Sequence, residues 1–107
     1  GDGKAESFRS LLEDMVPAVK ASEPNTMRYQ YFINSDDTKL TLIEVYPDNE
    51  AALFHMTAFG SSPFADEFLA SITITSFVVA GNASAALMEA VEPFTTDNRP
   101  FTQGFIR

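Results

Sequence analysis

The middle of the chain contains two strand-like segments, residues 27–34 (MRYQYFIN) and residues 39–46 (KLTLIEVY). Both are rich in aromatic and β-branched residues, and the polar turn at residues 35–38 (SDDT) separates them, so they predict a β-hairpin. Side chains alternate along a strand, so the second segment has two distinct faces. The residues of one face are Leu40, Leu42, Glu44 and Tyr46, and those of the other are Thr41, Ile43 and Val45. Both faces are largely apolar, so both must be covered, and a single layer of helices covers only one.

Helical patterns precede and follow the hairpin. After Gly1-Asp2-Gly3, which we expect to be a flexible start, apolar residues recur at the spacing of one face of an amphipathic helix: Phe8, Leu11, Leu12, Met15, Val16 and Val19. Asp48 is the expected N-cap of a second helix that ends at Gly60, and Ser62-Pro63 begins another helix.

The last part of the chain predicts two further strands and a short helix. Residues 72–80 (ITITSFVVA) have the composition of a buried strand. Ser84 is expected to cap a short helix that Pro93 halts, and residues 101–107 (FTQGFIR) are expected to end the chain as a strand.

This order of elements is typical of an α+β fold, a ferredoxin-like antiparallel sheet with helices on one face. The chain has 107 residues, so we expect one domain that spans residues 1–107. We also expect a second copy of the chain to bury the open face of the sheet, which makes the predicted assembly a homodimer.

The charge and the residue types missing from the chain exclude several functions. Fifteen Asp and Glu residues against seven Lys and Arg give a net charge of −8, which argues against nucleic acid and anionic membrane as partners. The chain has no Cys and a single His, His55, so no metal site is expected. No membrane-span pattern and no signal peptide are evident, and the predicted localisation is cytoplasmic.

Aromatic residues are unusually frequent, with ten Phe, three Tyr and no Trp. Aromatic side chains dominate both protein cores and the walls of ligand pockets, so their number does not distinguish the two.

Several short motifs, in order, resemble the antibiotic biosynthesis monooxygenase family over about residues 4–80. They are Lys4-Ala5-Glu6-Ser7-Phe8, Glu23-Pro24-Asn25, Tyr29 and Tyr31, Glu44-Val45-Tyr46-Pro47-Asp48 with Ala51, Ala52 and His55, and Ser62-Pro63-Phe64. Members of that family are small dimeric α/β barrels, and some oxidise quinols or polyketide phenols with O₂ and no cofactor. The resemblance therefore implies a dimeric α/β barrel that takes a small aromatic ligand and needs no cofactor.

The chain departs from the family pattern at both ends and in its lack of Trp. The family normally opens with a strand before the first helix, and residues 81–107 extend beyond its usual last strand. Either the terminal strand at residues 101–107 fills the vacant position, in its own subunit or in the partner, or the chain is trimmed upstream; both alternatives stay open. A short crossover would place that strand parallel to residues 72–80. Members that degrade haem use Trp together with Asn and His, so that activity is not expected.

Cofactor-free oxygenation requires a general base, hydrogen-bond donors for a phenolate and an apolar pocket. His55 carries the only side chain whose unperturbed pKa suits such a base, and it matches a His that the family often carries on its second helix. Glu44 or a Tyr hydroxyl could orient the imidazole ring, so the catalytic candidates are His55 and Glu44. The alternative is a partly buried, structural His packed beside Met56 and Phe59.

The candidates for substrate binding are aromatic residues, namely Tyr29, Tyr31, Tyr46, Phe59 and Phe64. Packing is the alternative role of the strand tyrosines. Glu44 interrupts an apolar stripe, which indicates either a pocket wall or an ion pair with an Arg. The acidic pairs Asp36-Asp37 and Asp66-Glu67 are interpreted as turn and helix-start residues rather than as catalytic or metal-binding groups.

Three functions remain open from the sequence. The first is a cofactor-independent monooxygenase that oxidises a small aromatic or quinol-type substrate with O₂. The second is a non-catalytic ligand-binding or isomerase-like relative that uses the same pocket. The third is a structural dimer whose aromatic residues all belong to the core.

Overall fold

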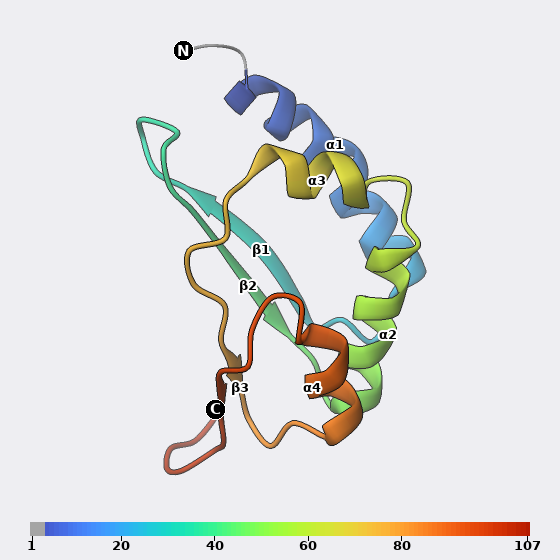
Figure 1. Cartoon of the computed structure of the whole chain (residues 1–107), viewed down its shortest axis with the longest axis vertical. Helices are drawn as coiled ribbons and strands as arrows, with labels where there is room; N and C mark the ends of the chain where they lie inside the picture. Colours follow the sequence, from blue (N-terminus) through green and yellow to red (C-terminus); the bar gives the residue numbers. More distant parts are fainter. Residues whose placement is uncertain (1–3) are drawn as a thin grey trace. The chain divides into compact units, whose positions relative to one another are not determined.

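The computed structural model describes residues 4–107, so the predicted flexible start at residues 1–3 lies outside the described part. The elements follow in the order α1 (Lys4–Ser22), β1 (Arg28–Ile33), β2 (Leu40–Val45), α2 (Asn49–Gly60), α3 (Ala65–Ser71), β3 (Val79–Ala80), α4 (Ala85–Val91) and β4 (Asn98–Arg99) (Figure 1). The chain divides into two compact units, of which the first ends at Thr73 and the second runs from Ile74 to Arg107.

The predicted hairpin is confirmed. β1 and β2 pair antiparallel, with Tyr29 opposite Glu44 and Tyr31 opposite Leu42. In the turn, the side-chain carbonyl of Asn34 accepts hydrogen bonds from two backbone N–H groups, at 3.0 and 2.8 Å, and Asp37 adopts a φ of 60°. Asn and Asp tolerate such local bonding and left-handed backbone, which explains why this short polar sequence closes the hairpin.

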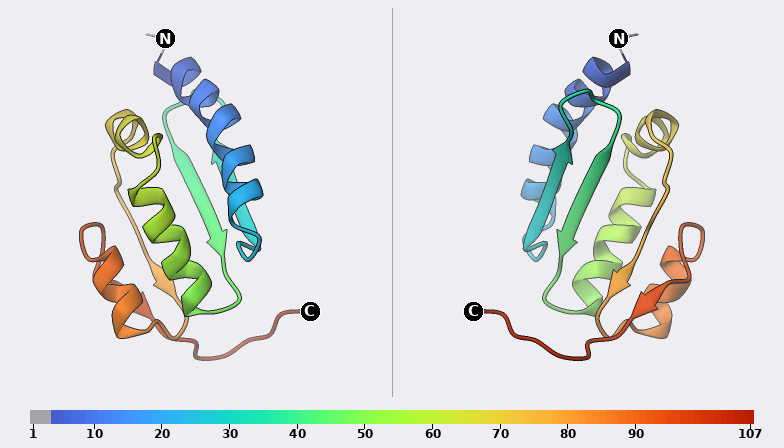
Figure 2. Two further views of the ribbon diagram at one scale, coloured as in Figure 1. Left: turned by 90° about the vertical axis from the view of Figure 1, so that its right-hand side faces the viewer. Right: turned by 90° about the vertical axis from the view of Figure 1, so that its left-hand side faces the viewer.

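The helices α1, α2 and α3 lie on one face of the hairpin (Figure 2). The predicted first helix is confirmed, and its apolar stripe packs on the sheet with Phe8, Leu11 and Met15 buried. These side chains form the core cluster together with Phe68 of α3. The Tyr31 ring of β1 packs edge-on against both Phe8 and Phe68, with ring centroids 6.3 Å apart in each pair. Some of the many aromatic residues of the chain therefore belong to the core.

The predicted N-cap residues of α2 and α4 are confirmed. The Asp48 side chain accepts from the backbone N–H of Ala51 at 2.8 Å, and the Ser84 side chain accepts from that of Leu87 at 3.1 Å. Each cap satisfies a backbone donor that the first helical turn leaves free.

The prediction of a buried strand at residues 72–80 is wrong. Only Val79–Ala80 forms a strand, and Ile74 and Val78 are exposed. A run of β-branched residues becomes a buried strand only where a neighbouring strand supplies hydrogen-bond partners along its length. Here the partner is β4, which pairs with β3 over two residues only.

The prediction of a terminal strand at residues 101–107 is also wrong, because this segment has no strand structure and its side chains are exposed. Pro100 lacks the N–H that a sheet needs, and Gly104 at a φ of +139° interrupts extended backbone. The expected parallel pairing with the segment before α4 does occur, but through Asn98–Arg99. The Asn98 side-chain amide supports it by donating to the carbonyls of Val79 and Gly81, at 2.9 and 2.8 Å.

The face of the hairpin opposite the helices is mostly exposed in the single chain, and it carries the apolar residues Phe32, Ile43 and Val45 beside the polar residues Arg28, Gln30 and Thr41. Phe32 of β1 is 48% exposed and Val45 of β2 is 36% exposed. These two residues belong to the second face that the sequence indicated must be covered.

Candidate functional site

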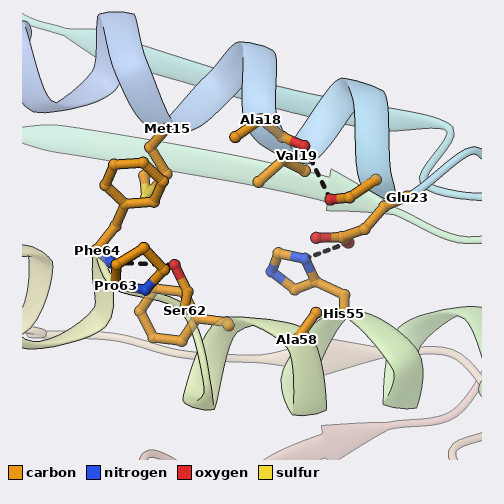
Figure 3. Close-up of a pocket in the computed structure, with 11 residues that line it drawn as sticks. Met15, Ala18, Val19, Glu23, His55, Ala58, Ser62, Pro63 and Phe64 are labelled. Atoms are coloured by element: carbon orange, nitrogen blue, oxygen red, sulfur yellow. Dashed lines mark hydrogen bonds and ion pairs between the residues drawn. The ribbon is translucent and has the colours of Figure 1, made fainter.

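A cavity of about 220 Å³ opens in the first unit between α1, α2 and the connection from α2 to α3 (Figure 3). Its wall is mostly apolar. The lining residues are Met15, Ala18, Val19, Ser22, Glu23, His55, Ala58, Phe59, Ser62, Pro63 and Phe64. Glu23 and His55 are the charged or titratable side chains of this wall, so any polar chemistry in the cavity centres on them.

His55 projects from α2 and forms hydrogen bonds through both ring nitrogens. Nδ1 lies 2.6 Å from Oε1 of Glu23, which directly follows α1, and Nε2 lies 2.9 Å from Oε1 of Glu44 on β2. His55 and Glu23 are each 5% exposed, and they are the buried polar residues of the described part of the chain. We refer to Glu23, His55 and Glu44 as the carboxylate–histidine triad. Figure 3 shows the Glu23 and His55 side chains pointing toward one another beside the cavity.

The two carboxylates determine the protonation of the imidazole. Burial by itself lowers the pKa of His55, but the hydrogen bonds and charges of Glu44 and then Glu23 outweigh burial, so the pKa is raised. Burial raises the pKa of Glu44, but the hydrogen bond and charge of His55, with a further bond from Tyr46, lower it below its usual value. The favoured state is an imidazolium between two carboxylates, with a net charge of −1 for the triad.

Three tyrosines lie on the sheet side of the triad. The Tyr46 hydroxyl donates to Oε1 of Glu44, and the Tyr29 and Tyr31 hydroxyl oxygens are hydrogen-bonded at 2.6 Å. Burial raises the pKa of Tyr29 to about 12, and burial followed by neighbouring charge raises the pKa values of Tyr31 and Tyr46 further. All three phenols therefore stay protonated at neutral pH and can act as hydrogen-bond donors.

Aromatic rings fix the orientation of the His55 ring. The Tyr29 and Tyr46 centroids lie 5.5 and 5.7 Å from that of His55, and Phe59 stacks on it at 6.4 Å. The imidazole is thus held in one orientation by two hydrogen bonds and by rings on its faces and edges.

The structure brings most of the predicted site residues together. His55, Phe59 and Phe64 line the cavity. Glu44, Tyr29 and Tyr46 contact His55 from the sheet side, and Tyr31 joins them through Tyr29; none of these four is among the residues that line the cavity. The partner of Glu44 is His55, not an Arg.

Glu23 is the residue that the sequence analysis missed as a member of the site. Glu23 stands directly before Pro24 and Asn25, which are typical turn residues, and acidic side chains in turns are normally solvated. One signal was available, because Glu23 continues the apolar stripe of α1 by the same four-residue step that joins Met15 to Val19. A carboxylate on that stripe must be buried with a partner, and His55 is the partner.

Within residues 4–107, no group of three or more His, Asp or Glu side chains is arranged to hold a metal ion. In the same part of the chain, no helix combines the length and apolar character needed to cross a membrane.

Comparison with known proteins identifies the family. The model of the antibiotic biosynthesis monooxygenase family matches residues 2–72, about two thirds of the chain, and its end falls beside the boundary between the two units. No curated protein and no solved structure matches the chain. The α+β architecture, an antiparallel hairpin with helices on one face, is consistent with the ferredoxin-like fold of this family. The chain belongs to the antibiotic biosynthesis monooxygenase family.

Proposed function

We propose that this protein is a cofactor-independent monooxygenase that oxidises a small phenolic or quinol-type molecule with O₂. The observation that carries the proposal is the carboxylate–histidine triad, of which Glu23 and His55 are buried in the wall of a mostly apolar cavity. Membership of a family in which some proteins perform this chemistry supports it. Pockets for drug-sized ligands hold about 300–1,000 Å³, so a cavity of about 220 Å³ favours a compact aromatic molecule.

The reaction needs a proton acceptor and a dry site. An anthrone has a ring CH₂ group and is in equilibrium with a phenol tautomer. The triad removes one proton, from the CH₂ group or from the hydroxyl of the phenol tautomer, and both losses give the same delocalised anion. The anion passes one electron to O₂, and the resulting radical and superoxide join to form a C–O bond. The peroxide regains the proton from the triad, its O–O bond breaks, and water leaves. Overall, the CH₂ group and O₂ become a carbonyl group and one water molecule, and both electrons for the second oxygen atom come from the substrate.

Each candidate residue has a role in this proposal. His55 and Glu44 are the catalytic candidates, because their ion pair balances charge while the triad takes up the substrate's proton. Phe59 and Phe64 flank the ligand in the cavity and exclude water. On the sheet side, the Tyr46 hydroxyl donates to Glu44 and the Tyr29 ring packs against His55, while the Tyr29 and Tyr31 hydroxyls bond to one another.

A second function, a ligand-binding or isomerase-like protein without oxygenase activity, is favoured by one observation. Both ring nitrogens of His55 are engaged by carboxylates, so the ring presents no free lone pair to a ligand. In this alternative the cavity binds the same class of aromatic molecule, and O₂ is not consumed.

The proposed assembly is a homodimer. Family members are typically dimeric, and the outer face of the hairpin, where Phe32 and Val45 are exposed, is the surface that a second copy would cover.

Oxygen uptake with a panel of hydroquinones and anthrones tests the function, and equilibrium dialysis of the same compounds under anaerobic conditions separates the two candidates. The monooxygenase predicts saturable uptake and a carbonyl product. Saturable binding with no uptake supports the ligand-binding protein, and absence of both contradicts the two proposals together. Glu50→Gln removes an exposed acid from α2 and leaves the triad intact. It is the control for the effect of net charge on oxygen uptake and on binding.

A further inference from the structure

We infer that Glu23 is the group that takes the proton from a phenolic hydroxyl bound in the cavity, while His55 bridges Glu23 and Glu44 as a cation. This inference rests on the proposed function, and it gives a catalytic role to Glu23, the first residue of the Glu23-Pro24-Asn25 motif.

Counting protons across the triad leads to this assignment. Each ring nitrogen of His55 faces a carboxylate oxygen, so each of the two hydrogen bonds needs one proton. Whether a proton sits on the ring or on a carboxyl, the triad then holds two protons and a net charge of −1. Removing one of these two protons would leave a lone pair of a His55 ring nitrogen facing a carboxylate oxygen in a buried site, which is strongly unfavourable. The triad can gain a third proton only on a carboxylate oxygen, because both ring nitrogens are already used.

Access to the cavity selects between the two carboxylates. Glu23 lines the cavity, whereas Glu44 lies on the sheet side, where the Tyr46 hydroxyl donates to it. Glu23 is the carboxylate of the cavity wall. The hydroxyls of the wall belong to Ser22 and Ser62, and each is already bonded to the backbone, of Ala18 and of Phe64 respectively. A phenol in this cavity therefore meets Glu23 as its hydrogen-bond acceptor.

Glu23 is also held in place for this task. Its Oε1 atom accepts from His55 Nδ1 at 2.6 Å and from the Thr26 hydroxyl at 3.0 Å. Fixed orientation reduces the cost of aligning a base with its substrate. The other titratable groups that face His55 are Glu44 and the phenols of Tyr29 and Tyr46. Both hydroxyls remain protonated, so the carboxylates and His55 alone set the charge of the site.

Anaerobic binding of 4-nitrophenol tests the assignment without relying on turnover. The compound changes colour on ionisation, so its bound form is read directly by absorbance below and above its own pKa. Wild type is expected to bind the neutral phenol at least about tenfold more tightly than the phenolate, because Glu23 accepts from the hydroxyl and repels the anion. Glu23→Gln keeps an oxygen for His55 Nδ1 but removes the charge, so its preference is expected to reverse toward the phenolate.

Glu44→Gln is the matched control, because it removes the same charge from the triad but leaves Glu23 in the cavity wall. Its preference for the neutral phenol is expected to fall less than that of Glu23→Gln, because the carboxylate that meets the phenol is still present. The assignment is overturned if Glu23→Gln behaves as wild type, or if Glu44→Gln reverses the preference as strongly, since net charge alone would then explain the effect. Absence of 4-nitrophenol binding by wild type would contradict the proposed function itself and the assignment with it.

Turnover provides a second readout once a substrate is found. Loss of a general base predicts a fall in kcat of about 10²–10⁴-fold in Glu23→Gln with KM nearly unchanged. Glu23→Asp, which retains a carboxylate, is expected to recover part of that loss. Equal losses in the Asp and Gln variants, with native circular dichroism in both, would show that Glu23 is only structural.

Discussion

Nδ1 of His55 lies 2.6 Å from Oε1 of Glu23, although the two residues are 32 positions apart in the chain. This contact ties the middle of α2 to the end of α1, and Nε2 ties α2 to β2 through Glu44 at 2.9 Å. One side chain thus connects three elements of the unit that ends at Thr73. The stability of this unit and the chemistry of its cavity both depend on the same buried charges.

His55→Ala is expected to lower the free energy of unfolding by about 3 kcal/mol, because it leaves two carboxylates without their shared partner. The value lies at the lower end of the range for broken buried pairs, since the Glu44 side chain is 24% exposed and partly solvated. Urea denaturation measures the loss, with Thr57→Ala on the exposed side of α2 as control. A change within about 0.5 kcal/mol would contradict a stabilising role for the triad.

Stability is expected to depend on pH through the same groups. The raised pKa of His55 contributes stability that is complete below its unfolded value of 6.5 and is lost as pH rises through the folded pKa. The lowered pKa of Glu44 contributes stability that is complete above its unfolded value of 4.5 and is lost as pH falls through the folded pKa. The contribution of the triad is therefore largest between these unfolded values.

Thermal melts of wild type and His55→Gln across this pH range isolate the contribution of the triad from that of other acidic groups. The difference in melting temperature between the two proteins is expected to be largest between the unfolded pKa values of Glu44 and His55, and to become smaller at lower and at higher pH. A difference that stays constant with pH would show that the pKa values of His55 and Glu44 are not shifted in the folded protein.

Tyr46→Phe is expected to cost about 1–2 kcal/mol, because it removes the hydroxyl that donates to the Glu44 carboxylate in a partly buried site. The same change is expected to raise the pKa of Glu44, since one of the bonds that favour its charged form is lost. Urea denaturation at neutral pH and at acidic pH measures both effects. A Tyr46→Phe protein as stable as wild type at both pH values would argue against this bond.

Phe32→Lys tests the proposed homodimer. A charged side chain on the open face of the hairpin would be buried without a partner, so the variant is expected to run as a monomer near 11.8 kDa while wild type has twice that mass. Phe105→Lys is the matched control, because Phe105 is an exposed aromatic of the second unit, and it is expected to stay dimeric. Light scattering distinguishes the outcomes, and a monomeric wild type at micromolar concentration would refute the dimer.

The sequence predicted those parts of the fold whose signals are local. The stripe of α1, the caps Asp48 and Ser84, and the alternation of β1 and β2 each involve neighbours along the chain, and all were confirmed. Residues 72–80 and 101–107 were assigned wrongly as strands, because a strand depends on a partner elsewhere in the chain that composition does not reveal.

The site was predictable only in part for a similar reason. His55 stood out as the single histidine, and Glu44 as a charge on an apolar stripe. Glu23 could be recognised only from its partnership with a residue 32 positions away. Its position on the stripe of α1 predicts burial, but the turn sequence around it favoured a solvated carboxylate.

The most direct test is oxygen consumption by wild type and His55→Gln with an anthrone, measured with an oxygen electrode and with product analysis. The monooxygenase predicts saturable uptake of one O₂ per molecule of substrate, formation of the quinone carbonyl, and loss of this activity in the folded variant. A folded wild-type protein that binds the anthrone but consumes no O₂, or a variant that consumes it at the wild-type rate, would contradict oxygenation at the carboxylate–histidine triad.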